Sequence, residues 1–177
     1  NLGNVLRDLG ELQEAELSTR KAIELKPDFI YAYYNLGKIL KDLGELQEAE
    51  ISYRKAIELN PDFAEAYSNL GNILRDLGEL QKAELYTRKA IELNPNYVYV
   101  HNNLGNILRD LGKLKEAELL YRKAIELNPN YAYAHNNLGN ILRNLGNLQE
   151  ARLCSEKIMS MRSWSILGSY SFNREMK

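Results

Sequence analysis

The stretch NLGNILRDLGELQKAELYTRKAIELNP, residues 69–95, decides the fold, because related copies of it begin at residues 1, 35, 103 and 137. All four prolines and all but one of the eleven glycines recur within these copies at a period of 34 residues. A period of this length over most of a chain is typical of a repeat array, in which each unit packs only on its neighbours. The 177 residues therefore do not form one globular core.

Each copy contains two amphipathic stretches separated by a glycine. In the second copy, apolar residues recur at helical spacing over 30–43 and again over 46–59. Gly44 favours a left-handed helix end, and Pro61 cannot continue the second helix. Asp62 follows the proline at a position suited to capping the next helix. The pattern predicts two antiparallel helices per copy, joined by a tight turn.

Small residues recur in register and would let two helix backbones approach closely. The run Tyr67-Ser68-Asn69-Leu70-Gly71, followed by Ala83 and then Pro95, resembles the signature of the tetratricopeptide repeat family. The resemblance implies an all-α fold, a right-handed superhelical α-solenoid of antiparallel helix pairs. The array would cover residues 1–163, as a partial unit 1–29 followed by units 30–63, 64–97, 98–131 and 132–163.

The last copy departs from this pattern. Ile158 and Ser163 stand where the earlier copies have alanine and proline, and the composition changes after residue 163. We expect residues 164–177 to form a degenerate capping segment, with Trp164 and Leu167 packed on the last helices. A disordered tail and a docking surface for another chain are the alternatives. The chain opens inside a copy and without methionine, so we also expect it to be a piece of a longer protein.

Composition and charge exclude several classes of partner. Lys and Arg number 23 against 24 Asp and Glu, which gives a formal net charge of −1. Nucleic-acid binding requires an excess of cations facing phosphates, and the basic pentatricopeptide repeats that bind single-stranded RNA are commonly one residue longer. We expect no nucleic-acid partner. No apolar run approaches the roughly 18 residues of a membrane span, and a single cysteine suits a reducing compartment. The expected location is cytoplasmic, without membrane contact.

No residue pattern predicts catalysis, a metal or a cofactor. His101 and His135 lie one repeat apart, where the resemblance places a packed aromatic, and no further ligand stands at metal-binding spacing beside them. The glycines follow no phosphate-binding pattern, and Cys154 has no partner along its amphipathic stretch. Pairs such as Glu84 and Arg88, four residues apart, would form only a solvated outer face. We expect a non-enzymatic chain.

The polar face of each first helix carries an asparagine ladder, defined as the asparagine of Asn-Leu-Gly and the residue one turn later. Asparagine inside a helix costs about 0.5–0.7 kcal/mol relative to alanine, so its recurrence requires a reason. A carboxamide offers a donor and an acceptor that match the backbone of an extended peptide. The ladder resembles that in the repeat domain of nucleocytoplasmic O-GlcNAc transferases. Its members are Asn35, Asn69, Asn103 and Asn137, followed by Lys38, Asn72, Asn106 and Asn140.

Residues beside the ladder would supply selectivity. The predicted peptide-binding groove includes tyrosines one turn before the ladder and alternating charges beyond it, namely Tyr31, Tyr99, Tyr133, Arg75, Asp76, Arg109 and Asp110. The alternation indicates a groove of mixed polarity. Family members that clamp the C-terminal carboxylate of chaperones carry lysine and arginine where this chain has tyrosine and asparagine, so we do not expect such a ligand.

The preferred function is a non-enzymatic scaffold that binds an extended segment of a protein or peptide partner in a concave groove. Two other interpretations of the ladder stay open: its amides bond to one another or to neighbouring helices, or they are copies left by recent duplication. Two other functions also stay open. The array would recruit substrates for a larger enzyme such as a glycosyltransferase, or it would self-associate through array ends that expose Leu2, Val5 and Leu9.

Overall fold

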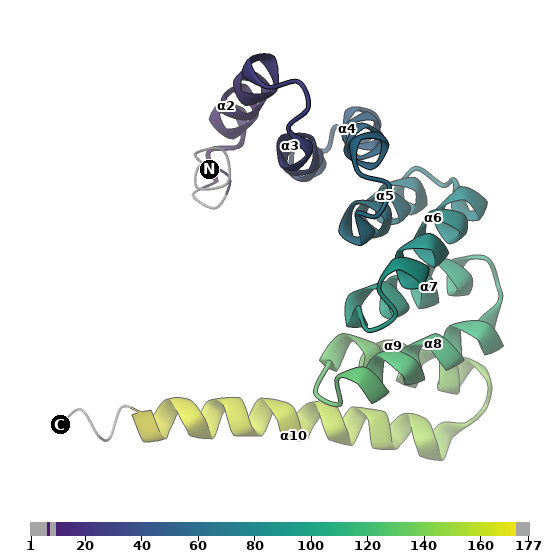
Figure 1. Cartoon of the computed structure of the whole chain (residues 1–177). Coiled ribbons are helices and arrows are strands. Elements are labelled where there is room, and N and C mark those ends of the chain that lie inside the picture. Colours follow the sequence, from purple (N-terminus) through teal and green to yellow (C-terminus); the bar gives the residue numbers. More distant parts are fainter. Residues whose placement is uncertain (1–6, 8–9, 173–177) are drawn as a thin grey trace. The chain divides into compact units, whose positions relative to one another are not determined.

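The computed structural model of the chain describes residue 7 and residues 10–172, with side chains up to residue 161. Over this part the regular structure is entirely helical, which confirms the predicted all-α class (Figure 1). The helices are α2 (Leu12–Leu25), α3 (Ile30–Leu43), α4 (Leu46–Leu59), α5 (Ala64–Asp76), α6 (Leu80–Leu93), α7 (Val98–Asp110), α8 (Leu114–Leu127), α9 (Ala132–Asn144) and α10 (Leu148–Phe172).

The helices fall into two compact bodies, an N-terminal body of residues 1–95 and a C-terminal body of residues 96–177. In the N-terminal body α3 pairs with α4 and α5 with α6, while α2 packs on α3 and α4 on α5. In the C-terminal body α7 pairs with α8 and α9 with α10, while α8 packs on α9. Each body is therefore a stack of helix pairs, which confirms the predicted solenoid. We call α3, α5, α7 and α9 the first helices and their partners the second helices.

The glycine after the first helix ends it as predicted. Gly44 has φ of 84°, in the left-handed region, and its N–H donates to the Lys41 carbonyl at 3.0 Å. The next amide, of Glu45, donates to the Leu40 carbonyl at 2.8 Å, so carbonyls of the last turn are satisfied. Glycines with φ between 76° and 82° follow α5, α7 and α9 in the same way.

The predicted capping role of Asp62 is wrong. The residue that precedes α5 is Phe63, and its side chain makes no capping hydrogen bond. The Asp62 N–H instead donates to Asn60 Oδ1 at 3.1 Å, because the Asn-Pro-Asp turn places the aspartate one residue too early to cap. Phe63 is 8% exposed and takes the capping position because its ring packs on Ala66 and Tyr34 in the core.

Small residues hold the two helices of each pair close together. The alanines Ala49, Ala83 and Ala117 of the second helices have no exposed surface. The Gly105 backbone lies so close to the buried Tyr121 ring that a Cβ at that position would stand 2.5 Å from Cε1. The period-34 glycines in the first helices are therefore packing sites rather than flexible points.

Helix α10 continues past the boundary expected at residue 163, as far as Phe172. Ser163 lacks the proline that ends the earlier second helices, so nothing in the backbone chemistry stops the helix there. The side chains of Trp164 and Leu167, and residues 173–177, lie outside the described residues, and so do Leu2, Val5 and Leu9. Their packing stays a prediction.

Candidate functional site

In the C-terminal body part of the asparagine ladder is bonded between neighbouring repeats. Asn137 on α9 donates from Nδ2 to the Oδ1 atoms of Asn102 and Asn106 on α7, at 2.9 and 3.1 Å. The Tyr121 hydroxyl donates to the same Asn106 Oδ1 at 2.9 Å. These bonds tie α9 to α7 and fix the orientation of two ladder amides.

The N-terminal body has a related bond with a different partner. Asn69 on α5 donates from Nδ2 to the Tyr34 hydroxyl on α3 at 3.2 Å. Burial raises the pKa of Tyr34 above its ordinary value, so this hydroxyl stays neutral at physiological pH. Lys38 lies over the same Tyr34 ring, 5.7 Å from its centroid, and Asn35 is only 8% exposed. Of these ladder positions Asn69 therefore joins two repeats, while Lys38 contacts a ring of its own helix.

Other ladder amides keep their hydrogen-bonding capacity. Asn72, Asn103 and Asn140 are partly exposed, and within the described part of the chain their side chains have no hydrogen bond. Asn106 keeps both Nδ2 hydrogens, since only its Oδ1 is engaged. The ladder is therefore divided between rungs that join repeats and rungs that present amides at the surface.

The charged end of the predicted groove is largely neutralised. Arg109 bonds the carboxylate of the adjacent Asp110 at 3.0 Å, and Arg7 bonds Asp42 of the next repeat at 3.1 Å. Arg75 is partly exposed and Asp76 is exposed. These groups give the mixed polarity expected from the sequence, without a concentrated charge of either sign.

The predicted tyrosines lie at the start of the first helices and face solvent. Tyr31 on α3 is 62% exposed, Tyr99 on α7 is 57% exposed and Tyr133 on α9 is 73% exposed. Side chains of this size are usually at least half-buried in folded proteins. Each body therefore presents aromatic surface next to its ladder amides.

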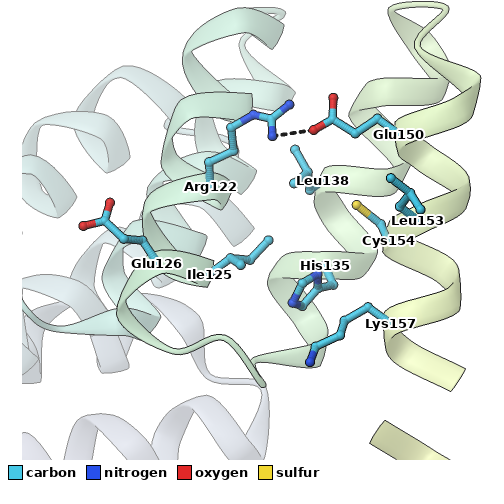
Figure 2. Close-up of a pocket in the computed structure, with 9 residues that line it drawn as sticks. All are labelled: Arg122, Ile125, Glu126, His135, Leu138, Glu150, Leu153, Cys154 and Lys157. Carbon is cyan, nitrogen blue, oxygen red and sulfur yellow. Dashed lines mark hydrogen bonds and ion pairs between the residues drawn. The ribbon is translucent and has the colours of Figure 1, made fainter. Parts of the chain in front are cut away.

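A pocket of about 440 Å³ lies between α8, α9 and α10 of the C-terminal body (Figure 2). Its interior is apolar, and the ion pair between Arg122 Nη1 and Glu150 Oε1, at 2.6 Å, stands at its rim. The residues shown in Figure 2 are Arg122, Ile125, Glu126, His135, Leu138, Glu150, Leu153, Cys154 and Lys157.

The N-terminal body has a pocket of about 620 Å³ at the equivalent repeat positions, each three periods earlier in the chain. It is lined by Arg20, Ile23, Glu24, Tyr33, Leu36, Glu48, Ile51, Ser52 and Lys55. In the next repeat Tyr86 stands at the position of Ser52; its ring stacks on Tyr67 at 6.0 Å and its hydroxyl accepts from Arg54 at 2.6 Å. The repeat after that has Leu120 at the same position. The sequence signal for the two pockets is therefore a small side chain, Ser52 or Cys154, where the copies between them carry a large one.

No group of three or more His, Cys, Asp or Glu residues in the described part of the chain could hold a metal ion. His101 and His135 are 5% and 8% exposed, which confirms that they are core side chains; His135 Nε2 lies 3.0 Å from the Pro129 carbonyl oxygen. Cys154 is buried, and burial raises the pKa of its thiol. Among the described helices none is both long enough and apolar enough to cross a membrane.

The stacked helix pairs define a helical repeat protein, and comparisons with known families identify which one. A family model for the TPR repeat matches residues 3–44, 37–78 and 105–146, and models for the tetratricopeptide repeat match residues 64–97, 86–118 and 132–163. The chain belongs to the tetratricopeptide repeat family. Proteins of this family bind other proteins, so the chain is a protein–protein interaction scaffold.

Several solved structures have the same fold. The chain is similar to a crystal structure of MamA, with 26% identity, 94% of this chain and 97% of that chain covered, and a TM-score of 0.83. It is also similar to YrrB, described as a TPR protein with an unusual peptide-binding site, with 26% identity, coverage of 98% and 89%, and a TM-score of 0.72. PilF of Pseudomonas aeruginosa, at 23% identity, 90% and 73% coverage and a TM-score of 0.84, shares the fold. A comparison with curated protein sequences gives no significant match.

Proposed function

We propose that the chain is a non-enzymatic scaffold that holds an extended segment of a partner protein against the ladder face of its first helices, in a concave groove. The carrying observation is the set of partly exposed ladder amides without a hydrogen bond in the described part of the chain, Asn72, Asn103 and Asn140. The proposal includes no catalytic residue and no cofactor. The partner is a protein or peptide.

An extended peptide backbone presents alternating carbonyl and N–H groups, and a carboxamide can pair with both at once. The amides stand on helices, and Asn106 is held by bonds to Asn137 and Tyr121, so little side-chain freedom is lost on binding. The name of the similar structure YrrB, a TPR protein with a peptide-binding site, supports peptide capture by an array of this kind.

Magnitudes show that the amides do not act alone. Three to five neutral hydrogen bonds contribute about 0.5–1.5 kcal/mol each, whereas a micromolar complex needs roughly 8 kcal/mol. In each body exposed tyrosine rings would supply much of the remainder by covering apolar side chains of the ligand: Tyr31 in the N-terminal body, Tyr99 and Tyr133 in the C-terminal body. The same face would recruit a substrate if the array were part of a larger enzyme.

The test begins with a phage-displayed library of random 12-residue peptides selected on the full chain. The dissociation constants of the selected peptides are then measured by fluorescence polarisation on the parent chain and on the double variant Asn103→Ala/Asn140→Ala, which removes two ladder amides of the C-terminal body. Loss of bonds to two amides is expected to weaken binding by roughly tenfold. Leu85→Ala is the matched control, because Leu85 is 66% exposed on the second helix α6.

Circular dichroism establishes that the variants keep their helices. Equal dissociation constants for the parent and the asparagine variant, with the helices intact, would contradict the groove. A loss of affinity in Leu85→Ala as large as that in the asparagine variant would move the binding site to the outer face.

A further inference from the structure

The C-terminal body carries a continuous row of tyrosine rings beside its ladder amides. The row consists of Tyr97, Tyr99, Tyr131 and Tyr133, from the starts of α7 and α9 and the turns before them. Successive ring centroids lie 6.0, 5.3 and 5.9 Å apart, and the first two pairs meet nearly at right angles. At these two contacts the edge of one ring therefore meets the face of the next.

The length of the row allows for one turn of polyproline II helix. The links through Tyr131 limit the separation of the Tyr99 and Tyr133 ring centroids to about 11 Å, and one turn of that helix rises roughly 9 Å. In that helix every third residue faces the same side. Successive same-side prolines would thus meet successive repeats of the array, one at Tyr99 and the next at Tyr133.

The polar groups beside the row suit a ligand that offers mainly acceptors. A proline-rich backbone has carbonyl oxygens and few N–H groups, so it needs donors from its receptor. The hydroxyls of Tyr99 and Tyr133 and the amides of Asn103 and Asn140 have no hydrogen bond in the described part of the chain. Burial and the neighbouring tyrosines raise the pKa of Tyr131, so its hydroxyl also remains a donor at neutral pH.

The segments that carry the tyrosine row contain no charged residues. Residues 96–108 and 128–142, which include the row and the amides beside it, contain no Asp, Glu, Lys or Arg. The N-terminal body has Tyr31 at the same repeat position, but its ring packs edge-on against the buried Phe63, and Glu65 occupies the position in the next repeat. An uncharged aromatic row exists only in the C-terminal body of the described chain.

We propose that the tyrosine row of the C-terminal body binds an uncharged, proline-rich segment of the partner in the polyproline II conformation. The proposal rests on the peptide groove proposed above and names the class of peptide that the groove takes. Proline rings would lie against the tyrosine rings, and the phenol and carboxamide groups would donate to the proline carbonyls.

A fluorescein-labelled peptide of ten prolines, titrated with the full chain and followed by fluorescence polarisation, tests the proposal. A Gly-Ser peptide of equal length and label is the control ligand. The ten-proline peptide is expected to bind roughly tenfold more tightly than the control, because its conformation is already ordered. The double variant Tyr99→Ala/Tyr133→Ala is expected to lose at least tenfold in affinity.

Leu119→Ala is the matched variant, because Leu119 is 67% exposed on α8 of the same body and lies outside both the tyrosine row and the ladder. Its affinity is expected to stay within about twofold of the parent value. Tyr99→Phe/Tyr133→Phe keeps the rings and removes the hydroxyl donors, so it is expected to give an intermediate affinity. Circular dichroism checks that each variant keeps its helices.

Equal binding of the proline and Gly-Ser peptides would overturn the proposal, and so would a Leu119→Ala effect as large as that of the double variant. The library peptides selected in the preceding experiment distinguish failure of the peptide groove from failure of its proline specificity. Library peptides that bind through Asn103 and Asn140, together with a proline peptide that does not bind, would support the groove and refute its proline specificity. Failure of both kinds of peptide refutes both proposals.

Discussion

Replacement of Gly105 by alanine tests how closely the helix pair α7 and α8 is packed. The new Cβ would stand 2.5 Å from Tyr121 Cε1 and 2.9 Å from Cδ1, distances that two carbon atoms cannot keep. The Tyr121 ring is fully buried and its hydroxyl bonds Asn106, so the ring cannot turn away without losing that bond. The two helices must therefore separate.

Gly139 is the matched position one repeat later. A Cβ there would meet Cys154 Cβ at 3.3 Å and the Ala151 carbonyl oxygen at 3.6 Å, so a shift of a few tenths of an ångström relieves it. Alanine in place of glycine gains about 1 kcal/mol of helix propensity at either site. Overpacking costs about 1–3 kcal/mol, and the rigid Tyr121 ring places Gly105→Ala at the upper end of that range. We expect Gly105→Ala to be destabilised by about 2 kcal/mol and Gly139→Ala to stay near the parent.

Urea unfolding, followed by circular dichroism at 222 nm, measures both variants. With a denaturant slope of about 2 kcal/mol per molar urea, the midpoint of Gly105→Ala should fall by about 1 M. Adding Tyr121→Leu should recover part of the loss, so the double variant would be more stable than the sum of the two single effects. Equal midpoints for Gly105→Ala and Gly139→Ala, or no coupling with Tyr121, would refute this account of the packing.

Two further predictions concern the outer pockets. Ser52→Tyr should stabilise the N-terminal body by about 1–2 kcal/mol, because the new tyrosine ring would fill the pocket as Tyr86 does in the next repeat. The urea midpoint should therefore rise, and an unchanged or lower midpoint contradicts the prediction. The hydrogen bond from Arg122 lowers the pKa of Glu150 below its ordinary value. The ion pair therefore stabilises the fold fully above the ordinary pKa of a glutamate, and this stabilisation is lost as the pH falls through the lowered pKa of Glu150. In an NMR titration Arg122→Ala should raise the pKa of Glu150 towards its ordinary value, whereas Arg88→Ala should leave it unchanged.

The fold follows from sequence because its determinants are local and repeat in register. Gly44 and Pro61 end helices by their own backbone chemistry, and the period of 34 shows where each end recurs. The capping residue was mispredicted because two side chains compete for one turn. Asp62 has the better capping group, but Phe63 has apolar surface to bury, and that burial decides where α5 begins.

The candidate site can be predicted from the sequence only in part, because the hydrogen-bond partner of a ladder asparagine depends on the residue that faces it in the preceding repeat. Asn69 and Asn137 hold the same repeat position, yet Asn69 donates to Tyr34 and Asn137 to Asn102. Tyr34 and Asn102 themselves occupy one equivalent position, so a single substitution changes the partner of the ladder amide. Periodicity within one helix does not carry this information, which depends on the packing of two repeats.

The same dependence bears on whether the ladder is merely a product of duplication. Duplication alone preserves residue types. It does not require that a ladder amide face a residue able to accept its hydrogen bond. The structure shows such agreement at two rungs, where a tyrosine hydroxyl and a carboxamide oxygen each accept from the facing Nδ2. These rungs explain why asparagine persists there, since an alanine would leave an acceptor unpaired at a packed interface. The explanation does not reach Asn72, Asn103 and Asn140, whose amides have no partner in the described part of the chain. At those rungs no hydrogen bond within the described part of the chain offsets the helix-propensity cost of asparagine, and this observation is the basis of the proposed peptide ligand.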